Sequence, residues 1–247
     1  MTTTSVTARA SRLRGARALF TGRAGGVSSG PHASLDLARH VGDDDAAVTE
    51  NRRRVSAEIG APLVFVDQVH GTEVVTVREG HRDGSVRTAD ALVTACTDVA
   101  LAIMVADCMP VLLVDPEAGV VGAAHAGRSG LLAGVLQETV RAMERLGAST
   151  GRIAAEIGPS ACGACYEVPA GMRAEAAAIL PSVAATTSRG TPSLDLRAGA
   201  VSALEAAGVD PSRVLADAPC TIEDPAYFSY RRSQVTGRFA GIILLEG

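Results

Sequence analysis

Three short apolar runs between Ala100 and Ala124 constrain the fold more than any other feature of this chain. The runs are residues 101–105, 111–114 and 120–124, and polar turns at 107–110 and 115–119 separate them. Each run is too short to cross a bilayer, but it has the length of a strand that is buried on both faces. The sequence therefore predicts buried strands at the centre of a globular protein.

The other segments carry strand and helix signals in a mixed order. Further strands are expected at residues 18–21, 64–69, 74–77, 153–157 and 239–245. Helices are expected at 45–59, 131–146, 169–180 and 195–207, with Asp43–Asp45 and Ser129 as N-terminal caps of the first two. Residues 184–192 are typical of a surface loop, and residues 1–12 of a flexible tail. Without an internal repeat or linker, we predict one mixed α/β domain over residues 1–247.

The charged residues exclude several classes of protein. The formal net charge is −4, and the chain has no Lys, so all 23 basic residues are Arg. Pyridoxal enzymes, class I aldolases and Walker-type nucleotidases, which depend on a Lys, are therefore excluded. The acidic balance argues against binding of nucleic acid, and no segment has the features of a membrane span or an export signal. We expect a cytoplasmic protein that acts on small molecules.

Three potential metal ligands follow predicted strands. They are His70, Cys108 and His125, and side chains at strand ends tend to gather in active sites. Two imidazoles and one thiolate suit zinc with its fourth position open, and a thiolate would also accept Cu(I). The alternative is one buried structural Cys and two ordinary histidines.

The remaining His and Cys residues have simpler interpretations. His32, His40 and His81 lie in polar surroundings and are expected at the surface. Cys162 and Cys165 have the spacing of a redox or zinc-knuckle pair, but without a second pair we interpret them as structural. Cys96 and Cys220 are expected to be core thiols, reduced because an exported disulfide protein is not indicated.

Two segments contain arginines that are candidates for binding an anion. Arg23 lies in a Gly-rich loop, residues 22–30, that matches neither a dinucleotide fingerprint nor a P-loop. Arg231 and Arg232 follow three aromatic residues within 227–232. A guanidinium binds phosphate or carboxylate with two hydrogen bonds, although a solvated basic turn is an equally good interpretation.

Seven sequence blocks in order resemble the laccase-domain family, the polyphenol-oxidase-like proteins of the YfiH type that are regarded as purine nucleoside phosphorylases. The blocks, which span nearly the whole chain, are TGRAGGVS at 21–28, DQVHGT at 67–72, ADALVT at 89–94, ADCMP at 106–110, AAHAG at 123–127, CYEV at 165–168 and FSYRR at 228–232. The resemblance implies a layered sandwich of mixed sheets flanked by helices. It also implies that His70, Cys108 and His125 are the zinc-binding catalytic residues.

The activities implied by the resemblance are phosphorolysis of adenosine, inosine, guanosine and methylthioadenosine, and deamination of adenosine. Arg23, Arg231 and Arg232 are then the candidates for holding phosphate, and Asp107 is a candidate for moving a proton. The chain has Arg128-Ser129 where the family commonly has Trp-Arg, and Cys162-Gly-Ala-Cys165 where it has Gly-Pro-Cys-Cys. Roles for Arg128 and Cys162 are therefore not carried over.

Other functions remain open at this point. Cys108 with His125 as its base would make a cysteine-centred hydrolase, acting for example on a cell-wall precursor. A zinc-stabilised binding module is a non-enzymatic alternative. A multicopper oxidase is disfavoured, because each copper needs several imidazoles and the chain has five histidines. The sequence does not distinguish a monomer from a homodimer.

Overall fold

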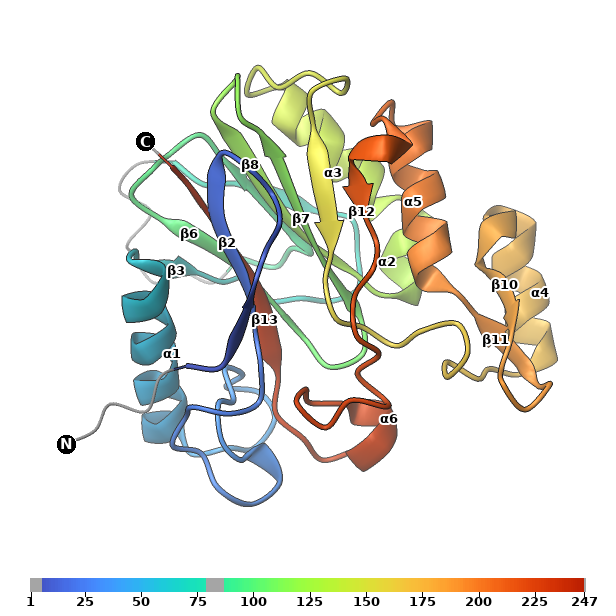
Figure 1. Ribbon diagram of the computed structural model, residues 1–247, viewed down its shortest axis with the longest axis horizontal. Helices are drawn as coiled ribbons and strands as arrows, with labels where there is room; N and C mark the ends of the chain where they lie inside the picture. The colour runs from blue at the N-terminus through green and yellow to red at the C-terminus, as the bar shows by residue number, and fades with distance from the viewer. Residues whose placement is uncertain (1–5, 79–86, 247) are drawn as a thin grey trace.

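Two β-sheets form the centre of the computed structural model, which describes residues 6–78 and 87–246 (Figure 1). The five-stranded sheet has the order β1-β2-β13-β6-β3, with strands Ala8–Ala10, Ala16–Thr21, Phe239–Leu245, Ala100–Val105 and Leu63–Val64. The six-stranded sheet has the order β12-β9-β7-β8-β5-β4, with strands Val214–Leu215, Ala154–Ile157, Met109–Asp115, Val120–Ala126, Ala91–Thr94 and Val74–Thr76. Both sheets mix parallel and antiparallel pairs.

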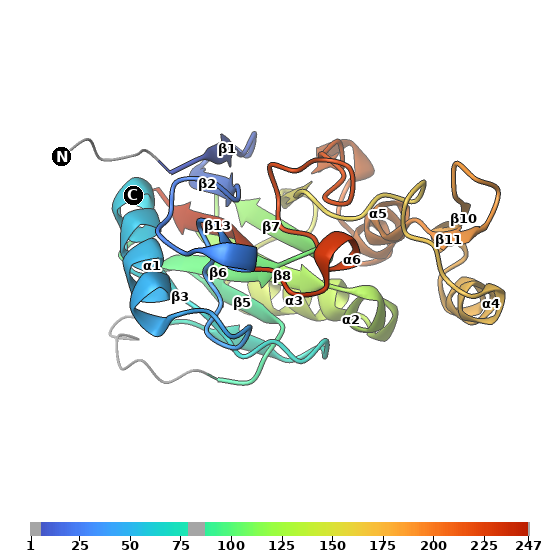
Figure 2. The same ribbon diagram turned by 90° about the horizontal axis from the view of Figure 1, so that it is seen from below.

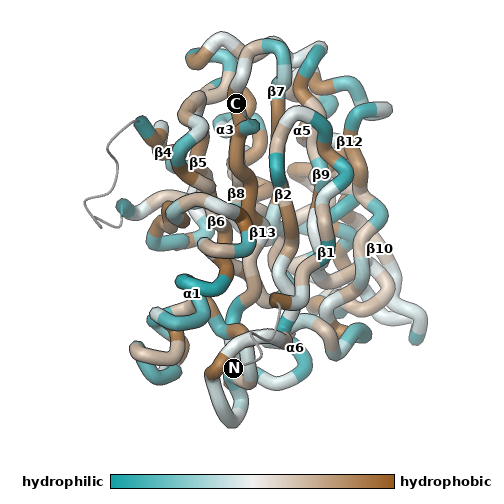
Figure 3. The backbone as a smooth tube through the Cα atoms, turned by 60° about the vertical axis from the view of Figure 1, so that its left-hand side comes forward, coloured by the Kyte–Doolittle hydropathy of each residue, from teal (hydrophilic) through white to brown (hydrophobic). Residues whose placement is uncertain are grey.

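The central strands are buried on both faces, as their unbroken apolar sequences predict. In β6, Leu101 and Ile103 face the second sheet, whereas Ala102 and Met104 face helix α1, Asp45–Ile59. Side chains of β7 alternate in the same way between the sheet interface and the opposite layer of helices. The result is a four-layer arrangement of helix, sheet, sheet and helices (Figure 2), and the tube in Figure 3 is most hydrophobic along these strands.

The helices begin and end at residues with recognisable local signals. Asp44 caps α1 by accepting the amide of Ala47, and Gly60 ends it with a left-handed conformation. Asp195 caps α5 in the same manner. The other helices are α2 Arg128–Ala133, α3 Val135–Glu144, α4 Ala170–Ile179, α5 Leu196–Ala206 and α6 Tyr230–Ser233, with short 3-10 turns at Gly30–His32, Pro181–Val183 and Pro211–Arg213.

Several local predictions differ from the structure. The helix expected at 131–146 is two helices, because Gly134 adopts φ 100° and breaks it. Ser129 lies inside α2 and does not cap it; Gly127 holds the cap position without a side-chain bond. The loop expected at 184–192 is bounded by a hairpin of β10, Ala184–Thr186, and β11, Pro192–Leu194.

The first described residues are also more ordered than expected. Ala8–Ala10 pairs with β2, and the side chains of Arg9 and Ser11 bind Glu156 in β9. The flexible tail predicted over residues 1–12 is therefore wrong for residues 8–12. None of the helices that the structure describes is long and apolar enough to span a bilayer.

Two chain segments cross directly between the sheets at one end of the molecule. One joins β3 to β4 and contains His70; the other joins β6 to β7 through residues 106–108 and contains Cys108. The strand expected at 64–69 is reduced to Leu63–Val64, so His70 lies in an irregular segment. These crossings bring together side chains that are far apart in sequence.

Candidate metal centre and cavity

His70, Cys108 and His125 lie together where the two sheets meet. One donor atom from each lies within 4.8 Å of the others, and Cys108 Sγ is 3.7 Å from His70 Nε2. The rings of His70 and His125 pack edge to face with centroids 4.7 Å apart. The structure thus brings the three predicted ligands to one place, although His70 and Cys108 lie on crossings between the sheets and His125 lies within β8.

His125 owes its direction to the alternation of β8. Its neighbours Ala124 and Ala126 face the helix layer, so His125 faces the other sheet. It lies within the strand, opposite Pro110, and not after the strand as the sequence suggested. Its Nδ1 bonds to Asp90 Oδ1 at 2.7 Å, which leaves Nε2 for a metal.

Asp90 also fixes the backbone around His70. Its carboxylate accepts the amides of His70 at 2.9 Å and of Gly71 at 2.6 Å. His70 has φ 61°, a conformation that is uncommon for a residue with a side chain and that clusters at functional sites. Sequence reasoning missed Asp90 as part of the site, although the block ADALVT at 89–94 contains it.

Cys108 and His125 shift each other's pKa. Burial by itself would raise the pKa of Cys108, but hydrogen bonds with His125 and His70 lower it to about 6. Burial would likewise lower the pKa of His125, but the bonds with Asp90 and Cys108 raise it to about 9. The site therefore favours a thiolate at neutral pH, which is the form that binds a metal.

This donor set fits a zinc ion. Zinc–sulfur and zinc–nitrogen bonds of about 2.3 and 2.0 Å in a tetrahedron place the two donors about 3.5 Å apart, close to the 3.7 Å between Cys108 Sγ and His70 Nε2. His125 additionally has the carboxylate partner that metal-binding imidazoles commonly have. Three protein ligands leave one position for substrate or water.

A cavity of about 390 Å³ opens beside the three donors. This volume is within the range of sites for small molecules, roughly 300–1,000 Å³. Its lining combines the donors with guanidinium, aromatic, amide and carboxylate groups, including His40, Asp67, Gln68, Asp107, Arg128, Tyr166, Tyr230, Arg231 and Arg238. Sequence reasoning did not select Gln68, Tyr166, Tyr230 or Arg238 individually.

The arginines fall into two groups. Arg128 and Arg231 line the cavity, whereas Arg23 and Arg232 do not. Arg23 bonds to the carbonyl of Ala33 and stacks on Phe228, and Arg232 bonds to backbone carbonyls such as that of Thr221. Within the described ranges, the Arg128 guanidinium bonds to no protein group, so it is available to a ligand.

Asp107 has a supporting part in the cavity wall. Its Oδ1 accepts the hydroxyl of Thr221 at 2.6 Å, and its Oδ2 accepts the amide of Arg231 at 2.7 Å. The residue has φ 91° at the sharp crossing between the sheets. Both carboxylate oxygens are thus occupied with holding neighbouring loops, which favours a positioning role over proton transfer.

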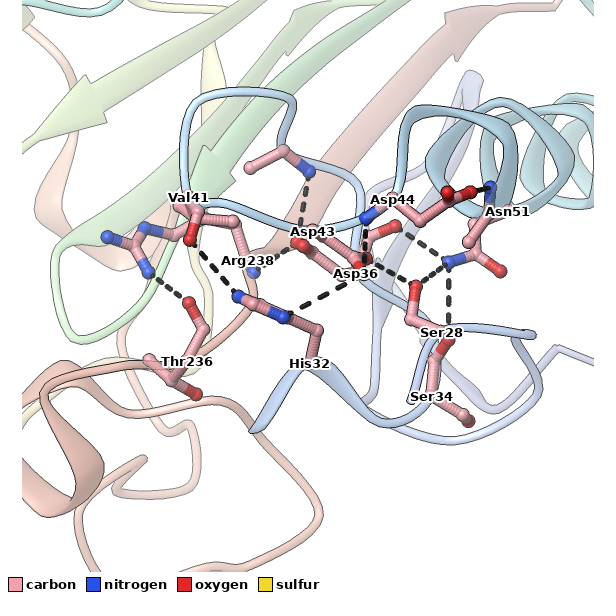
Figure 4. A network of polar contacts seen from close by, with 12 residues as sticks. Ser28, His32, Ser34, Asp36, Val41, Asp43, Asp44, Asn51, Thr236 and Arg238 are labelled. Atoms are coloured by element: carbon pink, nitrogen blue, oxygen red, sulfur yellow. Dashed lines mark hydrogen bonds and ion pairs between the residues drawn. The ribbon is translucent and has the colours of Figure 1, made fainter. Parts of the chain in front are cut away.

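Two of the three histidines expected at the surface are described. His32 is buried and accepts or donates a hydrogen bond with the carbonyl of Val41 at 3.2 Å, so that expectation was wrong. It belongs to the polar network of Figure 4, in which Asp36 accepts the amide of Arg238 at 2.8 Å. His40 is exposed at the cavity. His81 lies outside the described residues.

The cysteines also differ from expectation. Cys96 and Cys220 are half-buried and not fully enclosed core thiols. Cys220 lies against Cys162, whose amide donates to its sulfur at 3.4 Å. Burial, followed by neighbouring thiols, raises the pKa of both Cys162 and Cys165. Cys162 and Cys165 therefore have a third thiol beside them.

The fold and the site define a class of protein: two stacked mixed sheets between helices, with two imidazoles and one thiolate gathered where two crossings meet strand β8. The family model described as "Multi-copper polyphenol oxidoreductase laccase" matches residues 17–246. The chain belongs to this family, as its resemblance predicted.

Relatives and solved structures agree with this membership. A Streptomyces coelicolor protein named purine nucleoside phosphorylase is 49% identical, covering 95% of this chain and 97% of the relative. A Corynebacterium glutamicum protein of the same name is 47% identical, covering 95% and 96%. The crystal structure of a Neisseria meningitidis DUF152 protein has a TM-score of 0.86, with 36% identity over 99% of this chain and all of that one. The Bacillus licheniformis protein YfiH has a TM-score of 0.85, with 29% identity over 94% and 93%. The predicted fold class is confirmed.

Proposed function

We propose that this chain is a zinc-dependent purine nucleoside phosphorylase of the cytoplasm. Its substrates in this proposal are adenosine, inosine, guanosine and methylthioadenosine together with phosphate, and adenosine deamination is a second activity. The names of relatives that are 49% and 47% identical over nearly the full length support the phosphorylase activity. The range of nucleosides and the deamination come from the family resemblance.

The observation that carries the proposal is the position of the cavity, which places a metal-binding donor set beside guanidinium groups that line the same space. Phosphorolysis breaks the bond between ribose C1′ and the purine nitrogen and joins C1′ to a phosphate oxygen. The site must therefore hold an anion and an aromatic base next to each other. Arg128 and Arg231 supply positive charge in this cavity, and Tyr166 and Tyr230 supply aromatic surface.

The roles of the residues follow from their contacts. His70, Cys108 and His125 hold the zinc ion, which when bound supplies a Lewis acid next to the substrate. Asp90 keeps the His125 imidazole in the tautomer that binds through Nε2. Arg128 and Arg231 hold phosphate, while Arg23 and Arg232 support the backbone of neighbouring loops.

The test is to incubate metal-analysed protein with adenosine and inosine, with and without phosphate. Release of free base only with phosphate is the expected result for a phosphorylase. Inosine formed from adenosine without phosphate is expected for the second activity. Failure to release base from either nucleoside with phosphate, in protein that contains zinc, would contradict the proposal.

One observation favours a second candidate, a cysteine hydrolase. The lowered pKa of Cys108, to about 6, and the Asp90–His125 hydrogen bond resemble the arrangement of an activated nucleophile, its base and an orienting carboxylate. Removal of metal distinguishes the two. A hydrolase would keep its activity after chelation and lose it on alkylation of Cys108, whereas the zinc enzyme would lose activity on chelation.

A further inference from the structure

A second group of metal-ligating side chains lies outside the centre described above. It consists of Cys162, Cys165, Cys220 and Glu223, and one ligand atom from each lies within 4.8 Å of the others. Cys162 and Cys165 lie on the segment between β9 and α4, and Cys220 and Glu223 on the segment between β12 and α6. Side chains from two separate loops thus converge on one point.

The backbone around this group is folded to present the sulfurs together. The carbonyl of Cys162 accepts the amides of Cys165 at 3.0 Å and of Tyr166 at 2.9 Å, which closes a tight turn. A β-bridge between Ser160 and Cys220 aligns the two loops, and the Cys162 amide donates to Cys220 Sγ. Amide-to-sulfur bonds of this kind are common around metal-bound thiolates.

We propose that Cys162, Cys165, Cys220 and Glu223 bind a second zinc ion, with a structural role. Three thiolates and one carboxylate make a complete four-ligand set, in contrast to the three-ligand centre at Cys108. Zinc–sulfur bonds of about 2.3 Å place tetrahedral sulfurs about 3.8 Å apart, so small side-chain movements suffice to bind the ion. Sulfur ligands disfavour magnesium and calcium, which prefer oxygen.

A cation would also offset the repulsion between ionised thiols in this group. Thiols this close to one another cannot all ionise without a compensating charge, and zinc supplies it directly. The guanidinium of Arg197 lies beside the group and bonds to the carbonyls of Ser160 and Pro219 on both loops at 2.6 Å. The loops are therefore already held by one cation, and the proposed ion adds a second.

The first loop contributes Ala161 and Tyr166 to the cavity lining, and the second bonds to Asp107 in the same wall, so the proposed ion would stabilise that wall. Ala161 donates its amide to the carbonyl of Asp107, and Thr221, the residue after Cys220, donates its hydroxyl to the Asp107 carboxylate. On the same wall, Arg231 stacks on Tyr166 and bonds to the carbonyl of Glu167. The ion would lie behind these groups and would not touch a substrate.

The experiment is a zinc count per chain, made by mass spectrometry on protein expressed with zinc and dialysed in metal-free buffer. We expect about two ions in the unaltered protein, about one in Cys108→Ala, about one in Cys220→Ala and none in the double variant. Cys96→Ala is the control, because Cys96 is a half-buried thiol outside both groups, and it should keep both ions. This design separates the second site from the first, whatever reaction the first catalyses.

X-ray absorption of Cys108→Ala gives an independent measurement that does not depend on whether Cys220→Ala folds. The remaining zinc should have a shell dominated by sulfur, with three sulfurs and one oxygen. Either of two results would overturn the proposal: one zinc in the unaltered protein with none in Cys108→Ala, or a Cys162–Cys220 or Cys162–Cys165 disulfide in protein purified without oxidant.

Discussion

Gly127 leaves space for the donors of the candidate metal centre. A Cβ at this position would lie 2.8 Å from His70 Cδ2 and 2.9 Å from Cys108 Sγ, both closer than van der Waals contact. The backbone itself, at φ −81°, would accept alanine without strain. The requirement for glycine thus comes from the neighbouring donors and not from the turn.

Gly127→Ala should therefore lower zinc occupancy and activity while leaving the fold in place. The added methyl must displace one donor, at a cost of about 1–3 kcal/mol. The measurements are zinc content and thermal unfolding on the same preparation. Gly171→Ala is the matched control, since a Cβ there meets open space within α4, and it should leave zinc binding unchanged. Full zinc content in Gly127→Ala would contradict the close packing described here.

Arg128 is the cavity arginine without a protein partner among the described residues. Under the proposed function, Arg128→Ala should raise the KM for phosphate roughly tenfold to a hundredfold, because a charge-assisted hydrogen bond contributes about 1.5–3 kcal/mol. Adenosine deamination needs no phosphate and should change much less.

Arg23→Ala provides the contrast, since its guanidinium bonds to Ala33 and packs on Phe228 away from the cavity lining. It should lower stability but leave the KM for phosphate unchanged. If Arg23→Ala raised that KM and Arg128→Ala did not, the expectation from the sequence would replace the assignment made from the structure.

The sequence points to the candidate metal ligands more readily than to the residues that hold them in position. His70, Cys108 and His125 stand out because imidazole and thiol are rare and chemically distinctive groups. Asp90 and Arg238 belong to common residue types, and their importance depends on contacts across the fold. Asp90 is 35 positions from His125 in the chain, and local sequence carries no sign of that bond.

At the scale of secondary-structure elements, Asp115 joins the end of β7 to two turns. Its carboxylate accepts the amides of Ala118 and Ser149 and pairs with Arg152 at 2.9 Å. Burial by itself would raise the pKa of Asp115, but the bonds from Arg152, Ser149 and Ala118 lower it below its ordinary 3.8. The ionised carboxylate is thus favoured in the folded state.

This shift gives stability a predictable pH dependence. A carboxyl whose pKa is lower in the folded state stabilises the protein above its unfolded pKa, and this contribution is lost as pH falls through the folded value. Asp115→Asn should cost about 1–3 kcal/mol at pH 7, and its difference from the unaltered protein should shrink below about pH 4. Urea unfolding from pH 7 to pH 3 measures this. A difference that stays constant over that range would show that ionisation of Asp115 does not contribute.

Element boundaries were least predictable where side chains replace backbone pairing. Residues 64–69 have a strand-like sequence, but β3 ends at Val64. Beyond it, the side chain of Gln68 pairs with the backbone of Met104. Its Nε2 donates to the Met104 carbonyl and its Oε1 accepts a hydrogen bond from the Met104 amide, so this side chain satisfies the edge of β6 in place of a strand. An apolar pattern does not reveal such a substitution, because it reports burial and not the partner of each backbone group.

At the scale of the whole molecule, two donors of the candidate metal centre, His70 and Cys108, lie on crossings between the sheets, and the third, His125, lies in β8. A bound ion should therefore stabilise the complete fold and not only one loop. At a free zinc concentration of about 100 times Kd, the gain is about 2.7 kcal/mol, which corresponds to a Tm increase of roughly 5–10 °C for a chain of this size. Scanning calorimetry before and after chelation, with zinc added back, tests this, and Cys108→Ala should show a smaller change. An identical Tm with and without metal would indicate that the crossings are held by the protein alone.

The arrangement of layers was predictable in outline from the apolar runs, which require strands covered on both faces. The assignment of strands to two sheets was not, because the same alternating pattern suits either sheet. Only long-range pairing decides it, as in β13, which lies between β2 and β6.

The position of β13 has a consequence for synthesis on the ribosome. All strands of the six-stranded sheet lie between residues 74 and 215, so that sheet can pair while translation of the chain continues. In the other sheet, β2 and β6 both pair with β13 and not with each other, and β13 is translated after the other described strands. The nascent chain therefore carries two apolar, unpaired strand edges until residues 239–245 leave the exit tunnel. These edges are where chaperones would bind, and a ribosome that stalls before residue 239 would release a protein prone to aggregate.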